Sequence, residues 1–365
     1  MKIAIITHNP HYNIGGIETT VRKKISFWHT KHEITEFPLF KIEEDIKQVS
    51  KPYKNVKIDY TLLGWKPYNI LYGGSYTNKN MSVIFKEYDV VIFDTLVPSR
   101  KWVKHPKSII VQHEYQKFYN AWGKGFAISL GTFFSDYLFR AGSFRNPFKS
   151  ASNSVFFTKY DSIQTKGNTY TVQLPSLSEK EIKKFKVNRN RSGFIWVARI
   201  DNRIKNLKAL SKISNATSLV SIYGDGRDKK KLLKWLDNKD SFKGFIEHKN
   251  VQKEMNKNKA LIMTSKFEGF PNTIVEALSI GLPVILFDTF ESAKFLEESG
   301  AVFLIKNNDE KAFIEKMKWL ETLEKSEYDK IVNRAIKFSL KYLTDEIYEQ
   351  KWNQIIDVVY RKGGS

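Results

Sequence analysis

Two carboxylates, Glu268 and Glu276, stand eight positions apart in the stretch SKFEGFPNTIVEALSIGLPVI. The pattern predicts a loop at the carboxyl end of a strand, followed by a helix that Asn272 or Thr273 caps and that Gly281 ends. The free N–H groups at a helix N-terminus bind anions, phosphate above all. The two acids would therefore flank an anion site and accept hydrogen bonds from hydroxyl groups, a sugar on one side and a ribose on the other.

Basic side chains and glycine turns precede this stretch. The segment VARIDNRIKNL places Arg199 just after an apolar run and Lys205 six positions later. Arginine binds phosphate oxygens through two parallel hydrogen bonds, and lysine supplies a compact charge. Gly224 turns the chain in SIYGDG, and the backbone near Ile246 in FKGFI offers polar groups against which a flat base would lie. Together these pieces predict a site for a phosphorylated ligand.

Short apolar runs alternate with helix-like segments along the chain. KIAIIT, DVVIFD, KSIIVQ and NSVFF precede GFIWVA, SLVSIYG, ALIMTS and PVILFD, and all of them suit strands buried on both faces of a parallel sheet. A length of 365 residues indicates two domains at roughly 150 residues each. We expect an α/β fold of two doubly wound domains, 1–180 and 192–345, facing across a cleft where ligands bind beyond the strand ends. The charged segment Ser178–Arg191 is interpreted as their linker.

The composition excludes several classes of protein. The chain has no cysteine, which excludes disulfides and cysteine-based metal sites and fits a reducing cytoplasm. No apolar window reaches the roughly 20 residues of a membrane span, and MKIAIITHNP does not have the pattern of a signal peptide. The net charge is +21. It suits nucleic acid, an anionic membrane or a phosphorylated substrate, and a lysine-rich composition throughout the chain is the alternative explanation.

Part of the positive charge lies among aromatic residues. Residues 100–150 contain RKWVKHPK, EYQKFYNAWGKGF and FRAGSFRNPFK, with few acids. Such a surface can lie on anionic lipid, although some of these aromatic residues must belong to the core. We therefore expect a cytoplasmic protein, peripheral on the inner face of the cell membrane. Nucleic acid is not expected as a partner, because no RNA-binding motif is present.

The order of these motifs is similar to that of the retaining, GT-B-fold glycosyltransferases of family 4, also called glycosyltransferase group 1. The matching pieces are GGIET, VARIDNRIKNL, SIYGDG, FKGFI and EGFPNTIVEALSIGLPVI. The resemblance runs from about residue 1 to about residue 360, and it is specific in the second half and loose in the first. It implies transfer of a hexose or N-acetylhexosamine from a nucleotide sugar, most often UDP-linked, to a lipid-linked or envelope glycan, and it implies that the final helix, 346–362, packs on the first domain.

The resemblance also implies roles for single residues. Glu268 would contact hydroxyl groups of the donor sugar, Glu276 would hold the ribose, and Arg199 and Lys205 would bind the diphosphate. His113, which follows a predicted strand, would donate to the sugar; an ordinary loop histidine is the alternative. The other residues assigned to donor binding are Gly15, Gly16, Gly224, Ile246, Gly269, Phe270, Pro271, Asn272 and Thr273.

Three further expectations concern metal ions and cofactors, two histidines near the Gly loop, and the alternatives to a transferase. No Asp-x-Asp pair is present, so we expect no metal site, no cofactor and activity without a divalent cation. His8 and His11 flank the Gly loop and are alternative contacts for the acceptor. The alternatives to a transferase are a catalytically idle GT-B subunit that binds a glycan or partner, a nucleotide-sugar epimerase and a nucleic-acid-binding protein.

Overall fold

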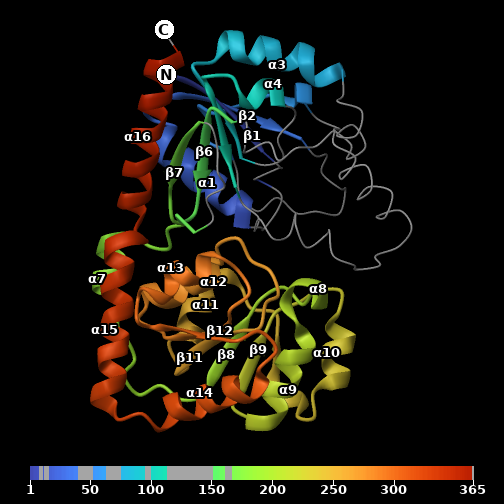
Figure 1. The fold of residues 1–365 in the computed structure, drawn as a ribbon, viewed down its shortest axis with the longest axis vertical. Helices are drawn as coiled ribbons and strands as arrows, with labels where there is room; N and C mark the ends of the chain where they lie inside the picture. The colour runs from blue at the N-terminus through green and yellow to red at the C-terminus, as the bar shows by residue number, and fades with distance from the viewer. Residues whose placement is uncertain are drawn as a thin grey trace. The chain divides into compact units, whose positions relative to one another are not determined.

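The computed structural model describes residues 1–7, 11, 16–39, 52–62, 75–94, 100–112, 151–160 and 167–363. These residues form two compact units. Unit 1 contains Met1–Val172 and Glu349–Ser365, and unit 2 contains Gln173–Tyr348. Figure 1 shows the course of the chain through each unit. No helix among the described ranges is long and apolar enough to cross a membrane.

Unit 1 is built on a parallel sheet. Its described residues form seven strands in the order β3-β2-β1-β4-β5-β6-β7, and the central strands are almost completely buried. The order reverses between β1 and β4, as in doubly wound folds. The elements of unit 1 are β1 (Lys2–Thr7), α1 (Gly16–Trp28), β2 (Glu33–Pro38), β3 (Lys57–Ile58), a short 3-10 turn (Tyr60–Leu62), α3 (Ser75–Glu87), β4 (Val90–Phe93), α4 (Arg100–Val103), β5 (Ser108–Val111), β6 (Asn153–Phe156), β7 (Asn168–Thr171) and the greater part of α16 (Asp345–Gly363).

The C-terminal helix α16 packs on unit 1 through aromatic rings. Trp352 lies edge-on to Trp28 of α1 with ring centroids 5.9 Å apart, and Trp28 Nε1 donates a hydrogen bond to Asn353 Oδ1 at 2.8 Å. The Lys24 ammonium lies 4.6 Å from the centroid of the Trp352 ring. The end of the chain therefore completes the core formed by its beginning.

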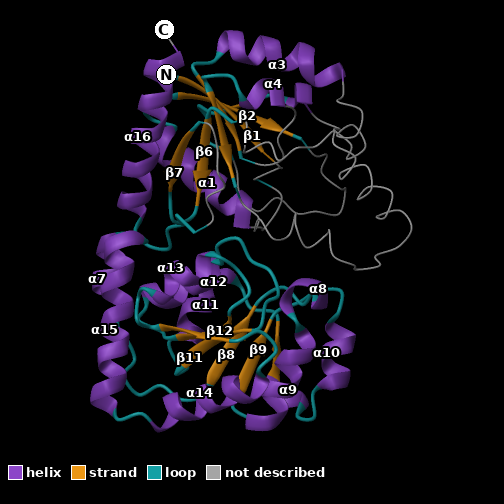
Figure 2. Ribbon diagram, viewed as in Figure 1, coloured by secondary structure: helices purple, strands orange, loops and turns teal. Residues whose placement is uncertain are grey.

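Unit 2 repeats the same architecture with six strands. Their order is β10-β9-β8-β11-β12-β13, all neighbours are parallel, and helices cover both faces of the sheet (Figure 2). The elements are α7 (Glu179–Lys184), β8 (Phe194–Val197), α8 (Asn202–Lys205), α9 (Leu207–Thr217), β9 (Val220–Tyr223), α10 (Lys229–Trp235), a 3-10 turn (Lys239–Ser241), β10 (Phe242–Gly244), α11 (His248–Met255), β11 (Ala260–Met263), α12 (Asn272–Ser279), β12 (Val284–Phe287), α13 (Ser292–Glu297), β13 (Val302–Ile305), α14 (Glu310–Thr322) and α15 (Lys325–Tyr342). Both sheets confirm the expected α/β class, and every strand predicted from an apolar run is present.

The segment Ser178–Arg191 differs from its interpretation as a linker. Ser178 caps α7 in a capping box with Glu181, and the segment belongs to unit 2. Arg191 is 6% exposed, and its guanidinium donates to the carbonyls of Ile280 at 2.8 Å and Gly281 at 2.7 Å. The charged residues were misleading because a buried guanidinium can satisfy the free carbonyls at a helix C-terminus, here that of α12.

The stabilising role of Arg191 can be tested by comparison with its neighbour Arg189. Replacing Arg191 with Met leaves two buried carbonyls without donors, and we expect it to lower the free energy of unfolding by about 3 kcal/mol. Arg189→Met removes a half-exposed ion pair with Asp329 and is expected to cost less than about 1 kcal/mol. Urea unfolding followed by circular dichroism measures both, and equal losses would contradict the role given to Arg191.

Candidate functional site

The carboxyl ends of β8 and β11 form the centre of the candidate site in unit 2. These strands are neighbours, and the strand order reverses between them. Chains leaving such a pair of strands turn to opposite sides, which opens a crevice at the sheet edge where ligands bind in open α/β sheets. The loop after β8 carries Arg199 and leads into α8, while the loop after β11 carries Glu268 and leads into α12.

An ion pair joins these two loops. Lys205, at the end of α8, bonds through Nζ to Glu268 Oε1, and their side chains are only 17% and 14% exposed. Two further hydrogen bonds hold the loops together, from the Thr264 hydroxyl to the Lys205 carbonyl at 2.8 Å and from the Lys266 N–H to the Ile204 carbonyl at 2.7 Å. The sequence predicted both charged side chains at this edge but assigned them to different parts of a ligand, whereas here they contact each other.

The helix α12 presents its N-terminus at the same edge. Its N-cap is Pro271, without a side-chain cap, so the expectation that Asn272 or Thr273 caps the helix is wrong. Both residues lie inside its first turn, and their N–H groups have no acceptor in the part of the chain that the structure describes. A proline at the N-cap leaves these donors available for an anion. Gly281 follows the helix with φ +66°, as predicted.

The residues around this N-terminus have different roles. Phe270 is 5% exposed and packs against Phe295, so its side chain belongs to the core and only its backbone can face a ligand. The Gly269 carbonyl accepts a hydrogen bond from the Ser292 hydroxyl at 2.5 Å. Glu276, in the second turn of α12, accepts from or donates to His248 Nε2 at 3.0 Å, depending on which group holds the proton.

Glu276 and the loop after β10 form a second corner of the site. The Glu276 side chain is 13% exposed, while His248 at the start of α11 is 78% exposed. Ile246 lies in the same loop, half-buried, beside Phe245, which is 70% exposed. The sequence predicted Ile246 and Glu276 here but not their neighbour His248, whose position depends on the pairing of β10 with β9.

Arg199 is exposed just after β8, and no described residue forms a hydrogen bond or an ion pair with its guanidinium. Its carbonyl accepts from the Asp201 N–H at 2.9 Å. Arg199, Lys205 and the N-terminus of α12 thus supply positive potential at one sheet edge, with Glu268 and Glu276 beside it. This combination can bind a phosphorylated ligand that also carries hydroxyl groups.

Gly224 contributes through a close approach of backbones. A Cβ atom at Gly224 would lie 2.0 Å from the Ala198 carbonyl oxygen, and one at Gly226 would lie 2.5 Å from that of Ile200. The loops after β8 and β9 can therefore contact directly, and the Ile200 N–H donates to the Asp225 carbonyl at 2.8 Å. Gly224 was predicted as a ligand contact, and this packing is sufficient reason for glycine at the position.

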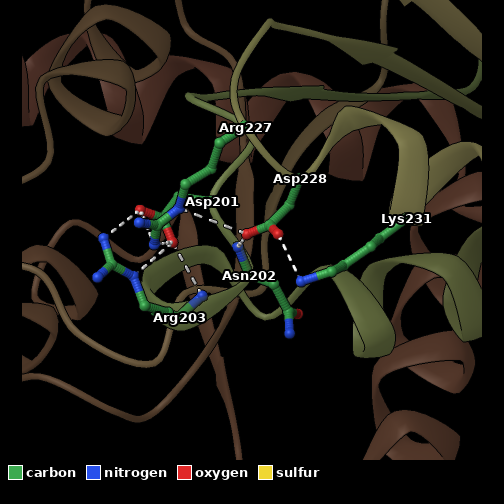
Figure 3. A network of polar contacts seen from close by, with 6 residues as sticks. All are labelled: Asp201, Asn202, Arg203, Arg227, Asp228 and Lys231. Atoms are coloured by element: carbon green, nitrogen blue, oxygen red, sulfur yellow. Dashed lines mark hydrogen bonds and ion pairs between the residues drawn. The ribbon is translucent and has the colours of Figure 1, made fainter. Parts of the chain in front are cut away.

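The contact between these loops creates a polar network that sequence analysis missed (Figure 3). Asp201 caps α8 by accepting from the Arg203 N–H at 3.0 Å, and its carboxylate also binds the guanidinium groups of Arg203 and Arg227. Asp228 accepts from the Asn202 N–H and from Lys231 Nζ, both at 2.9 Å. Asp201 and Arg203 stand in VARIDNRIKNL, but their partner Arg227 is supplied by the next strand's loop.

Unit 1 carries buried polar pairs near the carboxyl edge of its own sheet. His11 Nε2 lies 3.0 Å from Glu36 Oε1, and both side chains are almost fully buried. Lys24 forms a buried ion pair with Asp94, just after β4. Burial lowers the pKa of Lys24, although the Asp94 carboxylate opposes that shift. Gly16 begins α1; Gly15, His8 and His113 lie outside the described residues, and so does most of the region 100–150.

Comparison with known proteins finds glycosyltransferases. The family model "Glycosyl transferases group 1" matches residues 178–338. The chain is 32% identical over 186 residues to a poly(glycerol-phosphate) alpha-glucosyltransferase of Bacillus subtilis; the match covers 45% of the chain and 26% of that relative. It is 35% identical over 108 residues to a lipopolysaccharide 1,6-galactosyltransferase of Escherichia coli, with 26% of the chain and 30% of that relative covered. The chain thus spans less than a third of the length of either relative.

Solved structures resemble the whole chain, among them the following two. Sucrose-phosphate synthase from Thermosynechococcus elongatus superposes with a TM-score of 0.74 at 13% identity and covers 99% of both chains. A TarM mutant of S. aureus, solved with fondaparinux, alpha-GlcNAc-glycerol and UDP, superposes with a TM-score of 0.65 at 12% identity, covering 98% of this chain and 99% of that one. At such identities the likeness shows the fold, two parallel-sheet α/β domains of the GT-B type.

The network yields a prediction about pH. The Lys231 ammonium and the Asn202 N–H hold the pKa of Asp228 below its ordinary value. Its stabilisation is therefore complete above the ordinary Asp pKa of about 3.9 and is lost as the pH falls through the lower, folded-state pKa. Asp228→Asn should lower the melting temperature at pH 6, and its difference from the wild type should shrink between about pH 4 and pH 2.

The matched control for this prediction is Asp237→Asn. Asp237 is exposed in the same unit, and no described residue pairs with its carboxylate. We expect it to change the melting temperature little at any pH. A wild-type advantage over Asp228→Asn that stays constant down to pH 2 would contradict the assignment.

Proposed function

We propose that this chain, whose residues 178–338 form a glycosyl transferases group 1 domain, is a retaining glycosyltransferase of family 4. It moves a hexose or N-acetylhexosamine from a UDP-linked sugar to a hydroxyl group of a lipid-linked or envelope glycan. Unit 1, which includes most of the final helix, would serve the acceptor, and unit 2 would bind the donor. One observation carries the proposal: Arg199, Lys205 and the free N-terminus of α12 share one sheet edge with two carboxylates.

Each part of the donor would contact a different group of residues at this edge. The diphosphate would lie against Arg199, Lys205 and the N–H groups of Asn272 and Thr273. Glu276 would accept from the ribose hydroxyls, since its carboxylate is held beside the loop after β10 by His248. Glu268 would accept from a sugar hydroxyl while keeping Lys205 in place. The base would lie along the backbone near Ile246, and His113, outside the described residues, would donate to the sugar.

Bond breakage in the donor builds negative charge on the departing diphosphate. Fixed donors aimed at that charge lower the barrier, and removing one of them typically costs about 100-fold in rate. Arg199, Lys205 and the α12 N-terminus supply such donors, and we propose that they act without a divalent cation or another cofactor. The acceptor oxygen would bond to the anomeric carbon on the face from which the diphosphate leaves, while a phosphate oxygen of the donor takes the hydroxyl proton, so that the anomeric configuration is retained without a protein nucleophile.

The acceptor class is supported by the relatives. One of them is named for glucosylation of poly(glycerol-phosphate) and the other for galactosylation of lipopolysaccharide. We propose an acceptor of this kind, anionic and anchored at the membrane. The protein would act in the cytoplasm, peripheral on the inner face of the membrane, with the basic aromatic region 100–150 against anionic lipid.

Nucleotide binding tests the donor site. A thermal-shift panel of UDP, GDP, ADP and their common sugar conjugates, with and without EDTA, should show a rise for the UDP family that EDTA does not change. The variants Lys205→Gln and Glu276→Gln should lose most of that rise. Lys230→Gln, which changes an exposed lysine on α10, should keep it. A chain that responds to no nucleotide would be the idle subunit of the alternative interpretation.

Membrane association is tested by vesicle flotation. We expect the wild-type chain to float with vesicles rich in phosphatidylglycerol and not with neutral phosphatidylcholine vesicles. Each Lys or Arg near the surface contributes about 1 kcal/mol, so binding should fall steeply as salt rises. Neutralising basic residues of 100–150 should abolish flotation without changing the UDP shift. Absence of binding to anionic vesicles would overturn this part of the proposal.

A further inference from the structure

Two arginines next to the proposed donor site share a single carboxylate. The Asp201 side chain is 8% exposed, while those of Arg203 and Arg227 are 63% and 49% exposed. Arg227 Nη2 lies 2.8 and 2.9 Å from the two Asp201 oxygens, and Arg203 Nη2 lies 3.2 Å from one of them. Three charged groups in contact thus carry a net charge of +1. The second pair in the network, Asp228 with Lys231, is neutral (Figure 3).

The two guanidinium groups keep donors for a ligand. A guanidinium has five N–H groups in a fixed fork. Asp201 and Asp228 engage Nε and Nη2 of both arginines, and Nη1 of each has no partner among the residues that the structure describes. Both side chains are substantially exposed, so these donors face solvent. The Nη1 groups of Arg203 and Arg227 can therefore donate hydrogen bonds to an anion from two directions.

The position of the pair is fixed by the backbone. Arg227 reaches Asp201 because Gly226 lets its loop approach the Ile200 carbonyl, and the Asp228 N–H donates to that same carbonyl at 3.2 Å. Arg203 is held from the other side by its place in α8, whose first turn Asp201 caps. Since the carboxylate orients both groups before any ligand arrives, little side-chain entropy remains to be lost on binding.

This pair is separate from the cations that we assign to the donor. Arg203 and Lys205 are two residues apart on α8, and two residues correspond to about 200° around a helix. Lys205 points to Glu268 at the switch point, so Arg203 points to the other side, toward the loop after β9. A single diphosphate held by Arg199 and Lys205 would leave the net charge of +1 on Arg203, Arg227 and Asp201 unbalanced.

We propose that Arg203 and Arg227, oriented by Asp201, bind a phosphate group of the acceptor. A phosphodiester carries one negative charge, which would balance the excess charge of +1, and each of its two non-bridging oxygens can accept from one guanidinium group. The proposal rests on the proposed function, because it names the acceptor class of the same site: a polymer of polyol phosphate. The network gives unit 2 a contact with the acceptor in addition to the donor.

The experiment compares two double variants that remove the same charge. Arg203→Gln with Arg227→Gln removes the proposed site, and Lys230→Gln with Lys234→Gln removes two exposed lysines of α10 that have no partner among the described residues. The probe is a short synthetic glycerol-phosphate oligomer, titrated by calorimetry, with an uncharged polyglycerol of equal length as comparison. UDP is titrated in parallel.

We expect the arginine variant to weaken oligomer binding by about tenfold or more, because two charge-assisted contacts are lost. The lysine variant should weaken oligomer binding by less than about threefold. A loss of that size is what the removal of two positive charges from the surface causes through general electrostatic attraction alone. UDP affinity should stay unchanged in both. Arg203→Gln alone, which alters a largely exposed side chain, should give part of the loss and keep the melting temperature, so that misfolding cannot account for the result.

Two outcomes would overturn the proposal. Equal losses in the arginine and lysine variants would reduce the effect to net charge, and a parallel loss of UDP affinity would make the network a support for the donor site alone. Failure of the proposed function looks different. A wild-type chain that does not bind UDP or its sugar conjugates would reject the transferase, while the oligomer titration would still decide whether this pair binds phosphate.

Discussion

The contact between Lys205 and Glu268 across the reversal of strand order is the interaction on which the candidate site depends. It joins the loops after β8 and β11, which leave the sheet toward opposite sides. The Lys205 ammonium and the Glu268 carboxylate are largely shielded from solvent. They remain stable there because each neutralises the other and because hydrogen bonds from Thr264 and Lys266 fix the surrounding backbone. A ligand that enters this edge meets a site whose charges are already oriented.

Two glycines bring the loop after β9 into contact with the loop after β8. At Gly224 and Gly226 the backbone of one loop lies so close to its neighbour that a Cβ atom would collide with a carbonyl oxygen. That approach connects three consecutive strand ends, β11, β8 and β9, into one rim. The polar network around Asp201 depends on this close approach of the two loops. As a result, α8 contacts Glu268 on one side through Lys205 and Arg227 on the other side through Asp201.

Local sequence signals predicted most of the fold. Continuous apolar runs located β1, β4, β5 and β6 of the first sheet and β8, β9, β11 and β12 of the second, because a strand buried on two faces needs apolar residues at every position. Other strands escaped: β2 has the sequence EITEFP, with Glu36 buried in it, β10 has three residues, and the apolar run VFLI of β13 was not predicted as a strand. The segment Ser178–Arg191 was misinterpreted because charge indicates solvent only until a tertiary partner, such as the end of α12, makes its burial favourable.

The sequence by itself determined the class of fold, and it predicted the edge of the candidate site and the residues Arg199, Lys205, Glu268 and Glu276, since all of these follow from the order of motifs along one chain. Only the tertiary structure decided which of these groups touch. Lys205 meets Glu268, Glu276 meets His248 and Arg227 meets Asp201, and in each pair the partners come from different strand–helix units. Such pairings depend on strand order in the sheet, which no local pattern encodes, because it is set by how the helices pack over the sheet as a whole.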